Sequence, residues 1–213
     1  MKCCKEMMRL YAVTDRGWTK KTTLYCQIEE ALKGGVTCVQ LREKDMDEQE
    51  FIKEAIEIKG LCHAYNVPLI INDNVYVAIE AQADGIHVGQ DDMSVTEVRQ
   101  LVGNDMIIGV SAHNPKEEVE AVQGGADYLG TGAVFGSTTK NNVTTLSHDT
   151  LKAITSSVDV PIVAIGGINE TNIERLVGTG VDGIAVVSAI FAAKDIRSQC
   201  EKLKELSERM VNG

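Results

Sequence analysis

A short segment of similar composition recurs four times along the chain, each time just ahead of an apolar run that is typical of a β-strand. The copies are Gly35-Val36-Thr37-Cys38, Gln82-Ala83-Asp84-Gly85, Gly125-Ala126-Asp127-Tyr128 and Gly180-Val181-Asp182-Gly183. Counted from their second residues, successive copies lie 47, 43 and 55 residues apart, and each interval has room for two strand–helix units. The repeat therefore predicts a fold assembled from four similar quarters.

Short apolar runs alternate with stretches of helical periodicity along the chain. The predicted strands are residues 10–13, 38–41, 67–71, 85–88, 106–110, 128–129, 161–165 and 183–187. The predicted helices cover about residues 22–32, 47–65, 94–101, 149–155 and 170–177, with a short helix through residue 79, one that begins at residue 115 and a last one through residue 206. Strands separated by helices pair in parallel, so eight such units predict a single (β/α)8 TIM barrel. A doubly wound open sheet is the alternative, but it gives no reason for the fourfold regularity.

Two of the predicted helices begin with recognisable signals. Ser94 and Glu97 have the Ser-x-x-Glu spacing of a capping box, in which each residue satisfies a free amide at the helix start. Pro115 suits the first turn of a helix, because that turn needs no N–H from it.

Length and composition favour one soluble domain. The 213 residues are 44% hydrophobic and 24% charged, and no Pro-rich, Ser-rich or low-complexity linker divides them. We therefore expect one domain over residues 1–213, with residues 1–8 as a poorly structured N-terminal extension. Neither a signal peptide nor an apolar run of the roughly 18 to 20 residues that span a bilayer is apparent, so the sequence predicts a cytoplasmic protein.

Charge and cysteine usage narrow the classes of partner. The formal net charge is −10, which argues against a nucleic-acid or anionic-membrane surface and requires a local basic cluster for any anionic ligand. The six cysteines are scattered, without a C-x-x-C pair or a histidine at metal-ligand spacing, and we expect them to be reduced. A homo-oligomer is compatible with the sequence, which does not fix the oligomeric state.

Polar side chains follow the second predicted strand, at the end where the active sites of such barrels lie. Gln40, Arg42 and Lys44 alternate along this segment and so project to one side. Two cations and an amide on one face favour phosphate binding, whereas the alternative is a charged strand end exposed to solvent.

Carboxylates follow the third and fourth predicted strands, at Asn72-Asp73 and at Asp91-Asp92. Mg²⁺ prefers such oxygen ligands and usually takes only one or two protein carboxylates. An Asx turn at Asp73 and a helix cap at Asp92 are the structural alternatives. Their joint placement beside Arg42 favours the metal.

The last three strands are followed by segments suited to anions. The loop after the sixth strand contains Ser137, Thr138, Thr139 and Lys140, although a surface Ser/Thr turn would explain it as well. Gly166-Gly167 follows the seventh strand and Val187-Ser188 the eighth, where such barrels often bind phosphate. Among the histidines only His113, after the fifth strand, is a catalytic candidate, while His87 is expected to be a packing residue.

These residues belong to motifs through which the chain closely resembles the thiamine phosphate synthase family, also called thiamine-phosphate pyrophosphorylase, over nearly all of its length. The motifs occur in the family's order and are Tyr11-Ala12-Val13-Thr14-Asp15, Gln40-Leu41-Arg42-Glu43-Lys44, Ile71-Asn72-Asp73, Gly85-Ile86-His87-Val88-Gly89-Gln90-Asp91-Asp92, Gly109-Val110-Ser111-Ala112-His113-Asn114, Ala164-Ile165-Gly166-Gly167-Ile168 and Val186-Val187-Ser188-Ala189-Ile190.

The resemblance implies a (β/α)8 transferase of thiamine biosynthesis, which joins a hydroxymethylpyrimidine diphosphate to a thiazole phosphate and gives thiamine phosphate and pyrophosphate with Mg²⁺. By motif, the pyrimidine diphosphate would be bound by Gln40, Leu41, Arg42, Glu43, Lys44, Asn72, Ser111 and Lys140. The thiazole phosphate would be bound by Ser137, Thr138, Thr139, Gly167, Val187 and Ser188, and Mg²⁺ by Asp73 and Asp92. Catalysis would rest on Arg42, Lys44, Ser111 and Lys140.

The family reaction is dissociative, so pyrophosphate leaves before the thiazole nitrogen attacks and no protein nucleophile is needed. The chain departs from the family's usual Pro-Thr-x-Thr-Lys at Gly136-Ser137, which keeps a hydroxyl but loosens the backbone. A thiazole tautomerase and a non-catalytic sensor of thiamine phosphate are the alternatives. The retention of Arg42, Asp73 and Asp92 argues against both.

Overall fold

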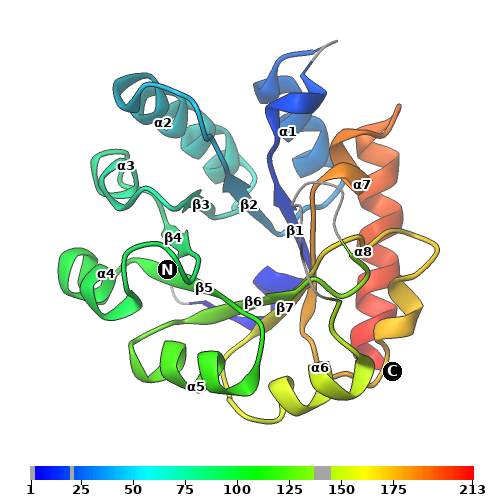
Figure 1. The fold of residues 1–213 in the computed structure, drawn as a ribbon. Coiled ribbons are helices and arrows are strands. Elements are labelled where there is room, and N and C mark those ends of the chain that lie inside the picture. Colours follow the sequence, from blue (N-terminus) through cyan, green and yellow to red (C-terminus); the bar gives the residue numbers. More distant parts are fainter. Residues whose placement is uncertain (1–2, 20–21, 137–144) are drawn as a thin grey trace.

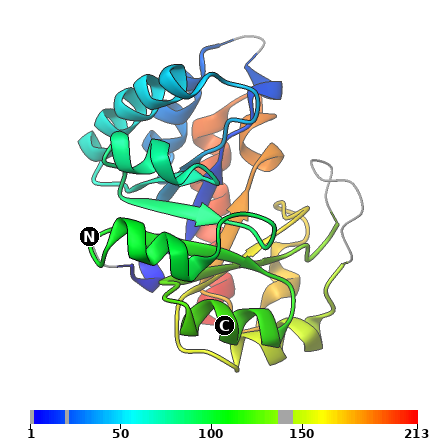
Figure 2. The same ribbon diagram turned by 60° about the vertical axis from the view of Figure 1, so that its left-hand side comes forward.

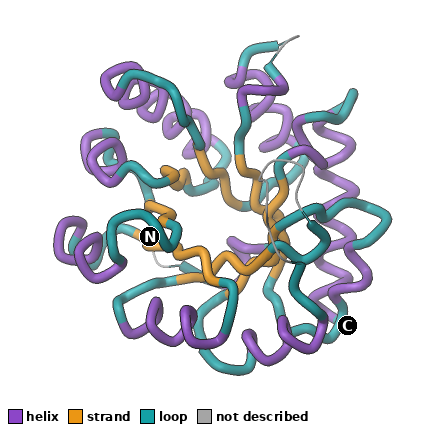
Figure 3. Tube along the Cα trace, in the orientation of Figure 1, coloured by secondary structure: helices purple, strands orange, loops and turns teal. Residues whose placement is uncertain are grey.

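A computed structural model describes residues 3–19, 22–136 and 145–213 and contains a closed barrel of eight parallel strands. Each strand pairs with its neighbours in chain order, and β1 pairs with β8 to close the ring. The strands lie at the centre and the helices around them (Figures 1 and 3). The strands are β1 (Leu10–Val13), β2 (Cys38–Leu41), β3 (Leu69–Asn72), β4 (Gly85–Val88), β5 (Ile107–Ala112), β6 (Tyr128–Gly132), β7 (Ile162–Ile165) and β8 (Gly183–Val186). The predicted TIM barrel is confirmed.

The helices follow the strands in the predicted order. They are α1 (Leu24–Lys33), α2 (Glu48–Ala64), α3 (Val75–Glu80), α4 (Val95–Val102), α5 (Pro115–Gln123), α6 (His148–Thr155), α7 (Ser188–Phe191) and α8 (Ile196–Asn212), with 3₁₀ helices η1 (Lys5–Met8), η2 (Arg16–Trp18) and η3 (Ile173–Leu176). The capping box at Ser94 and Glu97 is confirmed, as is Pro115 in the first turn of α5. No helix in the described ranges is long and apolar enough to cross a membrane.

The prediction of an α-helix over residues 170–177 is wrong, because the crossover between β7 and β8 forms only the 3₁₀ helix η3. Asn172 accepts a hydrogen bond from the Asn169 amide and donates one to the Gly167 carbonyl, which holds the chain in a turn. Gly178 then adopts a φ of 77°, so the helix cannot continue.

The repeated segments, which lie just before the even-numbered strands, have a common structural role. The third residue of each copy accepts a hydrogen bond from an amide near the start of the preceding odd-numbered strand. The Asp84, Asp127 and Asp182 carboxylates accept hydrogen bonds from the Leu69, Ile108 and Ile162 amides at 2.8, 2.8 and 2.9 Å. In the first copy the Thr37 hydroxyl accepts from the Leu10 amide at 2.9 Å. Each contact pins an even-numbered strand to the preceding one, which explains why the third residue of each copy is polar.

Two apolar layers form the core. The larger one lies between strands and helices, and the smaller one fills the barrel interior with side chains that alternate with outward ones along each strand. The interior layer consists of Met7, Met8, Tyr11, Val13, Cys38, Ile70, Ile107, Tyr128, Val163 and Ala185.

The N-terminal segment closes the barrel at the end opposite the site. Met7 and Met8 of η1 are buried, and Met8 belongs to the interior layer. Figure 2 shows this segment at the end from which the strand arrows point away. The prediction of a poorly structured extension is therefore wrong for residues 5–8, because the barrel needs apolar side chains to fill its lower opening.

The carboxyl group of Glu118 on α5 is buried in the outer layer and accepts a hydrogen bond from the Thr131 hydroxyl at 2.9 Å. Burial raises its pKa above the ordinary value of 4.5. Burial favours the uncharged form of this carboxyl group, so the folded protein loses stability as pH rises through the higher pKa.

Glu118→Gln, which keeps the shape but does not titrate, is expected to gain thermal stability relative to wild type as pH rises from about 4.5, the ordinary pKa of the group, through its raised pKa, by on the order of 2–4 °C. Thermal unfolding across this range measures the difference. Glu120→Gln on the exposed side of the same helix is the control and should show no such trend. A difference for Glu118→Gln that is constant with pH would contradict the interpretation.

Candidate active site

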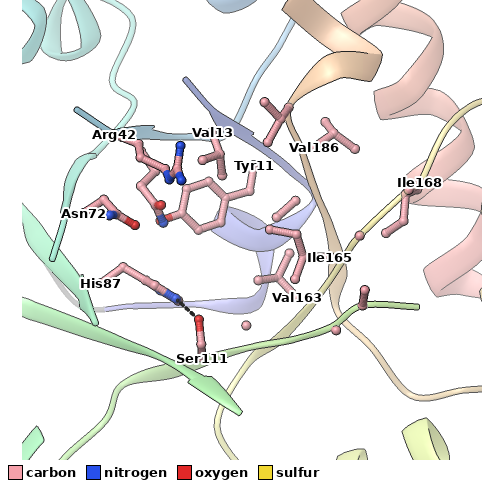
Figure 4. A pocket seen from close by; sticks show the side chains of 18 of the residues that line it. Tyr11, Val13, Arg42, Asn72, His87, Ser111, Val163, Ile165, Ile168 and Val186 are labelled. Atoms are coloured by element: carbon pink, nitrogen blue, oxygen red, sulfur yellow. Dashed lines mark hydrogen bonds between the residues drawn. The ribbon is translucent and has the colours of Figure 1, made fainter. Parts of the chain in front are cut away.

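A cavity of about 180 Å³ opens at the carboxyl ends of the strands. It brings together seven of the residues that the resemblance assigns to the site, namely Gln40, Arg42, Asn72, Ser111, Gly167, Val187 and Ser188. The candidate histidine, His113, lines the cavity too, and its Nδ1 lies 3.0 Å from Glu117 Oε2. Figure 4 shows Arg42, Asn72, His87 and Ser111 on one side of this space and the apolar side chains of Val163, Ile165 and Val186 on the other. The cavity therefore has one polar and one apolar wall, a combination that is typical of sites for small molecules.

A chain of hydrogen bonds crosses the floor of the cavity. The Gln40 amide Nε2 donates to the Tyr11 hydroxyl at 3.0 Å, and this hydroxyl lies 2.7 Å from the hydroxyl of Tyr128. The imidazole of His87 lies 2.9 Å from the Tyr128 hydroxyl through Nδ1 and 2.9 Å from the Ser111 hydroxyl through Nε2. The His87–Ser111 bond is drawn in Figure 4.

Three residues of this hydrogen-bond chain were not among the predicted site residues. They are Tyr11, Tyr128 and His87. His87 is 8% exposed and lines the cavity, so the expectation of a packing residue misses its polar contacts. The alternation of side chains along β4 is the sequence signal that places His87 inside the barrel, because Ile86 and Val88 belong to the outer layer.

The residues after β2 divide between two spaces. Arg42 lines both the cavity and an adjoining open hollow of about 630 Å³, whereas Lys44 lines only the hollow. Leu41 is fully buried in the outer layer, so any contact of this residue with substrate falls to its backbone. Gln40 and Arg42 therefore face the cavity together, as predicted, whereas Lys44 faces only the hollow.

Glu43 has a partner that sequence reasoning did not find. Its Oε2 accepts from Arg16 Nε at 2.6 Å, and the same guanidinium contacts Glu54 Oε1 at 2.6 Å. Burial raises the pKa of Glu43, and the bond to Arg16 opposes this shift. Arg16 thus ties the loop after β1 to the loop after β2 at the rim of the hollow.

Asp73 and Asp92 come together as predicted, although neither lines the cavity itself. Partial burial, a hydrogen bond with Asp92 and the charge of Asp92 raise the pKa of Asp73 to about 6. Asp92 Oδ2 also accepts from the Gly89 amide at 2.7 Å, while Ser94 caps α4, so Asp92 is not the helix cap. Two carboxylates that repel each other are a suitable donor set for one divalent cation. No group of three potential metal-ligating side chains occurs within the described ranges.

The loops after β6 and β7 run side by side. The Val134 and Phe135 amides donate to the Ile165 and Gly166 carbonyls, both at 3.0 Å. Gly167 has a φ of 67°, and a Cβ there would lie 2.7 Å from the Phe135 carbonyl oxygen, so only glycine permits this approach. Ser137, Thr138, Thr139 and Lys140, which follow in the β6 loop, lie outside the described residues.

Comparisons with known proteins agree with this architecture. The family model described as thiamine monophosphate synthase matches residues 10–190. The chain is 46% identical to the thiamine-phosphate synthase of Clostridium acetobutylicum, over 94% of this chain and 95% of that protein. It is 48% identical to that of Ruminiclostridium cellulolyticum, over 92% of this chain and 94% of that protein.

Solved structures give the same result. A thiamine phosphate pyrophosphorylase from Pyrococcus furiosus superimposes with a TM-score of 0.89 at 35% identity, covering 97% of this chain and 98% of that one. A 3-hexulose-6-phosphate synthase, with a TM-score of 0.64 at 16% identity, covers 93% of this chain and 99% of that one and shares the fold alone. From the family match and these identities, this chain belongs to the thiamine monophosphate synthase family.

Proposed function

We propose that this chain is a thiamine-phosphate synthase, a transferase that joins a hydroxymethylpyrimidine diphosphate to a thiazole phosphate. One observation carries the proposal most directly: Arg42 lines both the cavity of about 180 Å³ and the open hollow beside it. A substrate with a ring in the cavity and a diphosphate outside it would therefore meet Arg42 at the junction.

The two walls of the cavity suit two different substrates. Gln40 and Ser111 would contact the polar edge of the pyrimidine, and Asn72, Arg42 and Lys44 its diphosphate. Gly167, Val187 and Ser188 line the same cavity after β7 and β8 and would contact the thiazole phosphate. Ser137, Thr138, Thr139 and Lys140 are proposed for the phosphates from their motif alone.

The fit of the carboxylate pair supports a magnesium ion held by Asp73 and Asp92. Burial and the neighbouring charge of Asp92 raise the pKa of Asp73, and a divalent cation held by both carboxylates would relieve their repulsion. Bound there, Mg²⁺ would supply positive charge for the leaving diphosphate. Arg42 and Lys44 would supply the rest of that charge from the β2 side.

The reaction needs no protein nucleophile. The bond between the pyrimidine methylene carbon and the diphosphate oxygen breaks, and its electron pair leaves with the diphosphate. The thiazole nitrogen then uses its lone pair to form the new carbon–nitrogen bond. The residues of this chain bind and orient both substrates, so that the nitrogen faces the carbon as the diphosphate departs.

The purified protein is expected to release pyrophosphate and form thiamine phosphate in equal amounts when both substrates and Mg²⁺ are present, and to lose this activity on chelation. Pyrophosphate release and chromatography of the product measure the two. Isomerisation of the thiazole without coupling would assign the protein to the tautomerases, and binding without turnover to the sensors. Equal rates with and without a chelator would contradict the magnesium assignment alone.

The remaining expectations concern location and partners. A cytoplasmic location stays a prediction, supported by six cysteines that form no disulfide. Small phosphorylated substrates are the expected partners, without nucleic acid or membrane, and a homo-oligomer remains compatible with the chain.

A further inference from the structure

The loop after β7 is held by two asparagine side chains that lie outside the cavity. Asn172 Nδ2 donates to the Gly167 carbonyl oxygen at 2.9 Å, and Asn169 Nδ2 donates to the same oxygen at 3.2 Å. A carbonyl oxygen has two lone pairs, so these two donors satisfy it completely. The Gly167 carbonyl is therefore fixed in one direction, toward the start of η3.

The direction of this carbonyl determines where the next amide points. The peptide bond between Gly167 and Ile168 is trans, so its C=O and N–H bonds point to opposite sides. Gly167 and Ile168 line the cavity, whereas Asn169 and Asn172 do not (Figure 4). The carbonyl thus points away from the cavity, and the Ile168 N–H points toward it.

The preceding peptide is fixed in the same way from the loop after β6. The Phe135 amide donates to the Gly166 carbonyl oxygen at 3.0 Å, and Phe135 does not line the cavity. The Gly167 N–H therefore points to the cavity side as well. The guanidinium of Arg175 on η3 lies 4.9 Å from the centre of the Phe135 ring, a cation–π contact that holds this partner in place.

The two amides that face the cavity have no acceptor of their own. Within the described ranges neither the Gly167 nor the Ile168 N–H donates to another residue. Ile168 is only 4% exposed, and an N–H in such surroundings usually has a partner. A phosphate oxygen in the cavity would supply it, because anions accept strong hydrogen bonds from backbone amides.

We infer that Asn172 is a positioning residue, which acts through the Gly167 carbonyl so that the Ile168 amide donates to the phosphate group of a substrate. Its side chain does not touch that substrate. This role also gives a reason for the short crossover after β7, since Asn172 and Arg175 reach both loops from a single turn. The inference rests on the proposed function only in identifying the phosphate as that of the thiazole.

The decisive variant is Asn172→Ala, which removes the donor that fixes the carbonyl and leaves Gly167 in place. We expect the KM for the thiazole phosphate to rise about tenfold, which corresponds to one lost hydrogen bond to the ligand. The KM for the pyrimidine diphosphate should be unchanged. A rise in the KM for the pyrimidine diphosphate alone would assign the amides to the other substrate and contradict the inference.

Thr23→Ala is the matched control, because Thr23 also holds the start of a crossover, where its hydroxyl accepts from the Cys26 amide. It does not line the cavity. The control should lower the thermal midpoint by an amount similar to that of Asn172→Ala without changing either KM. If Asn172→Ala behaves like this control, or raises both KM values equally, Asn172 only stabilises the turn and the inference is wrong.

Inorganic phosphate tests the inference without turnover. In nitrogen-15 NMR spectra of the wild-type protein, added phosphate should shift the signal of the Ile168 amide, and Asn172→Ala should need about tenfold more phosphate for the same shift. An Ile168 signal that does not respond in the wild type, or that responds at the same concentration in the variant, would overturn the inference. The titration does not involve thiamine phosphate, so it separates the inference from the proposed function, which fails only if the wild-type protein makes no product.

Discussion

Asp92→Ala is expected to lower the rate of thiamine phosphate formation by on the order of 100-fold or more, because it removes half of the carboxylate pair proposed for Mg²⁺. The fold should tolerate the change. Asp92 is exposed, accepts a hydrogen bond from the Gly89 amide and shares one with the Asp73 carboxyl group. We therefore expect the thermal midpoint to fall by only about 2–4 °C, as the loss of these exposed hydrogen bonds would predict.

Two further variants separate charge from shape. Asp92→Asn keeps an oxygen that accepts from the Gly89 amide, so it should restore thermal stability but not activity. Asp91→Ala removes the neighbouring exposed carboxylate and should leave both nearly unchanged. The Asp92→Ala variant should also need a higher Mg²⁺ concentration than wild type for its half-maximal rate, because it has lost one of the two proposed ligands. Parallel losses of activity and thermal midpoint would instead make Asp92 a structural residue.

The barrel could be predicted from sequence because its repeat has a local physical cause. In each quarter of the barrel one polar side chain accepts a hydrogen bond from an amide of the preceding strand. These side chains are Thr37, Asp84, Asp127 and Asp182. A polar residue therefore recurs at the same position of each repeat. The seven site residues that line the cavity were also predictable, because the carboxyl ends of all parallel strands meet at one face.

Contacts between distant strands were not predictable in the same way. Tyr11, His87 and Tyr128 come from β1, β4 and β6 and lie in apolar runs, where each by itself looks like a core residue. Only closure of the barrel brings the Tyr128 hydroxyl within 2.7 Å of the Tyr11 hydroxyl and 2.9 Å of His87 Nδ1. The hydrogen bond of Arg16 to Glu43 likewise joins two loops, and the distance between them along the sequence does not reveal that they are neighbours in space.

The burial of η1 was missed for a related reason. Met7 and Met8 stand in a segment interrupted by charged residues, which carries no helical or strand periodicity. Their burial depends on an opening that exists only once eight strands have closed into a ring. The sequence around Gly183 contains a clue, because a strand that begins with glycine leaves room for another backbone.

Gly183→Ala is expected to destabilise the protein by about 3 kcal/mol or more. A Cβ at this position would lie 1.7 Å from the Met8 carbonyl oxygen and 2.8 Å from Arg9 Cα. Both neighbours are backbone atoms at the junction of η1 and β1, so neither can move aside as a flexible side chain would. For a chain of this length the thermal midpoint should fall by about 6–12 °C.

Gly60→Ala is the matched control, since Gly60 lies within α2 and a Cβ there would meet nothing within 4 Å. It should stabilise the protein by about 0.5–1 kcal/mol, because alanine loses less backbone freedom in a helix. Gly183 lies at the end of the barrel away from the cavity, so folded Gly183→Ala protein at low temperature should keep the wild-type KM for both substrates. A midpoint within about 1 °C of wild type would show that Met8 does not pack against the start of β8. A changed KM with an unchanged midpoint would mean that the two ends of the barrel are coupled.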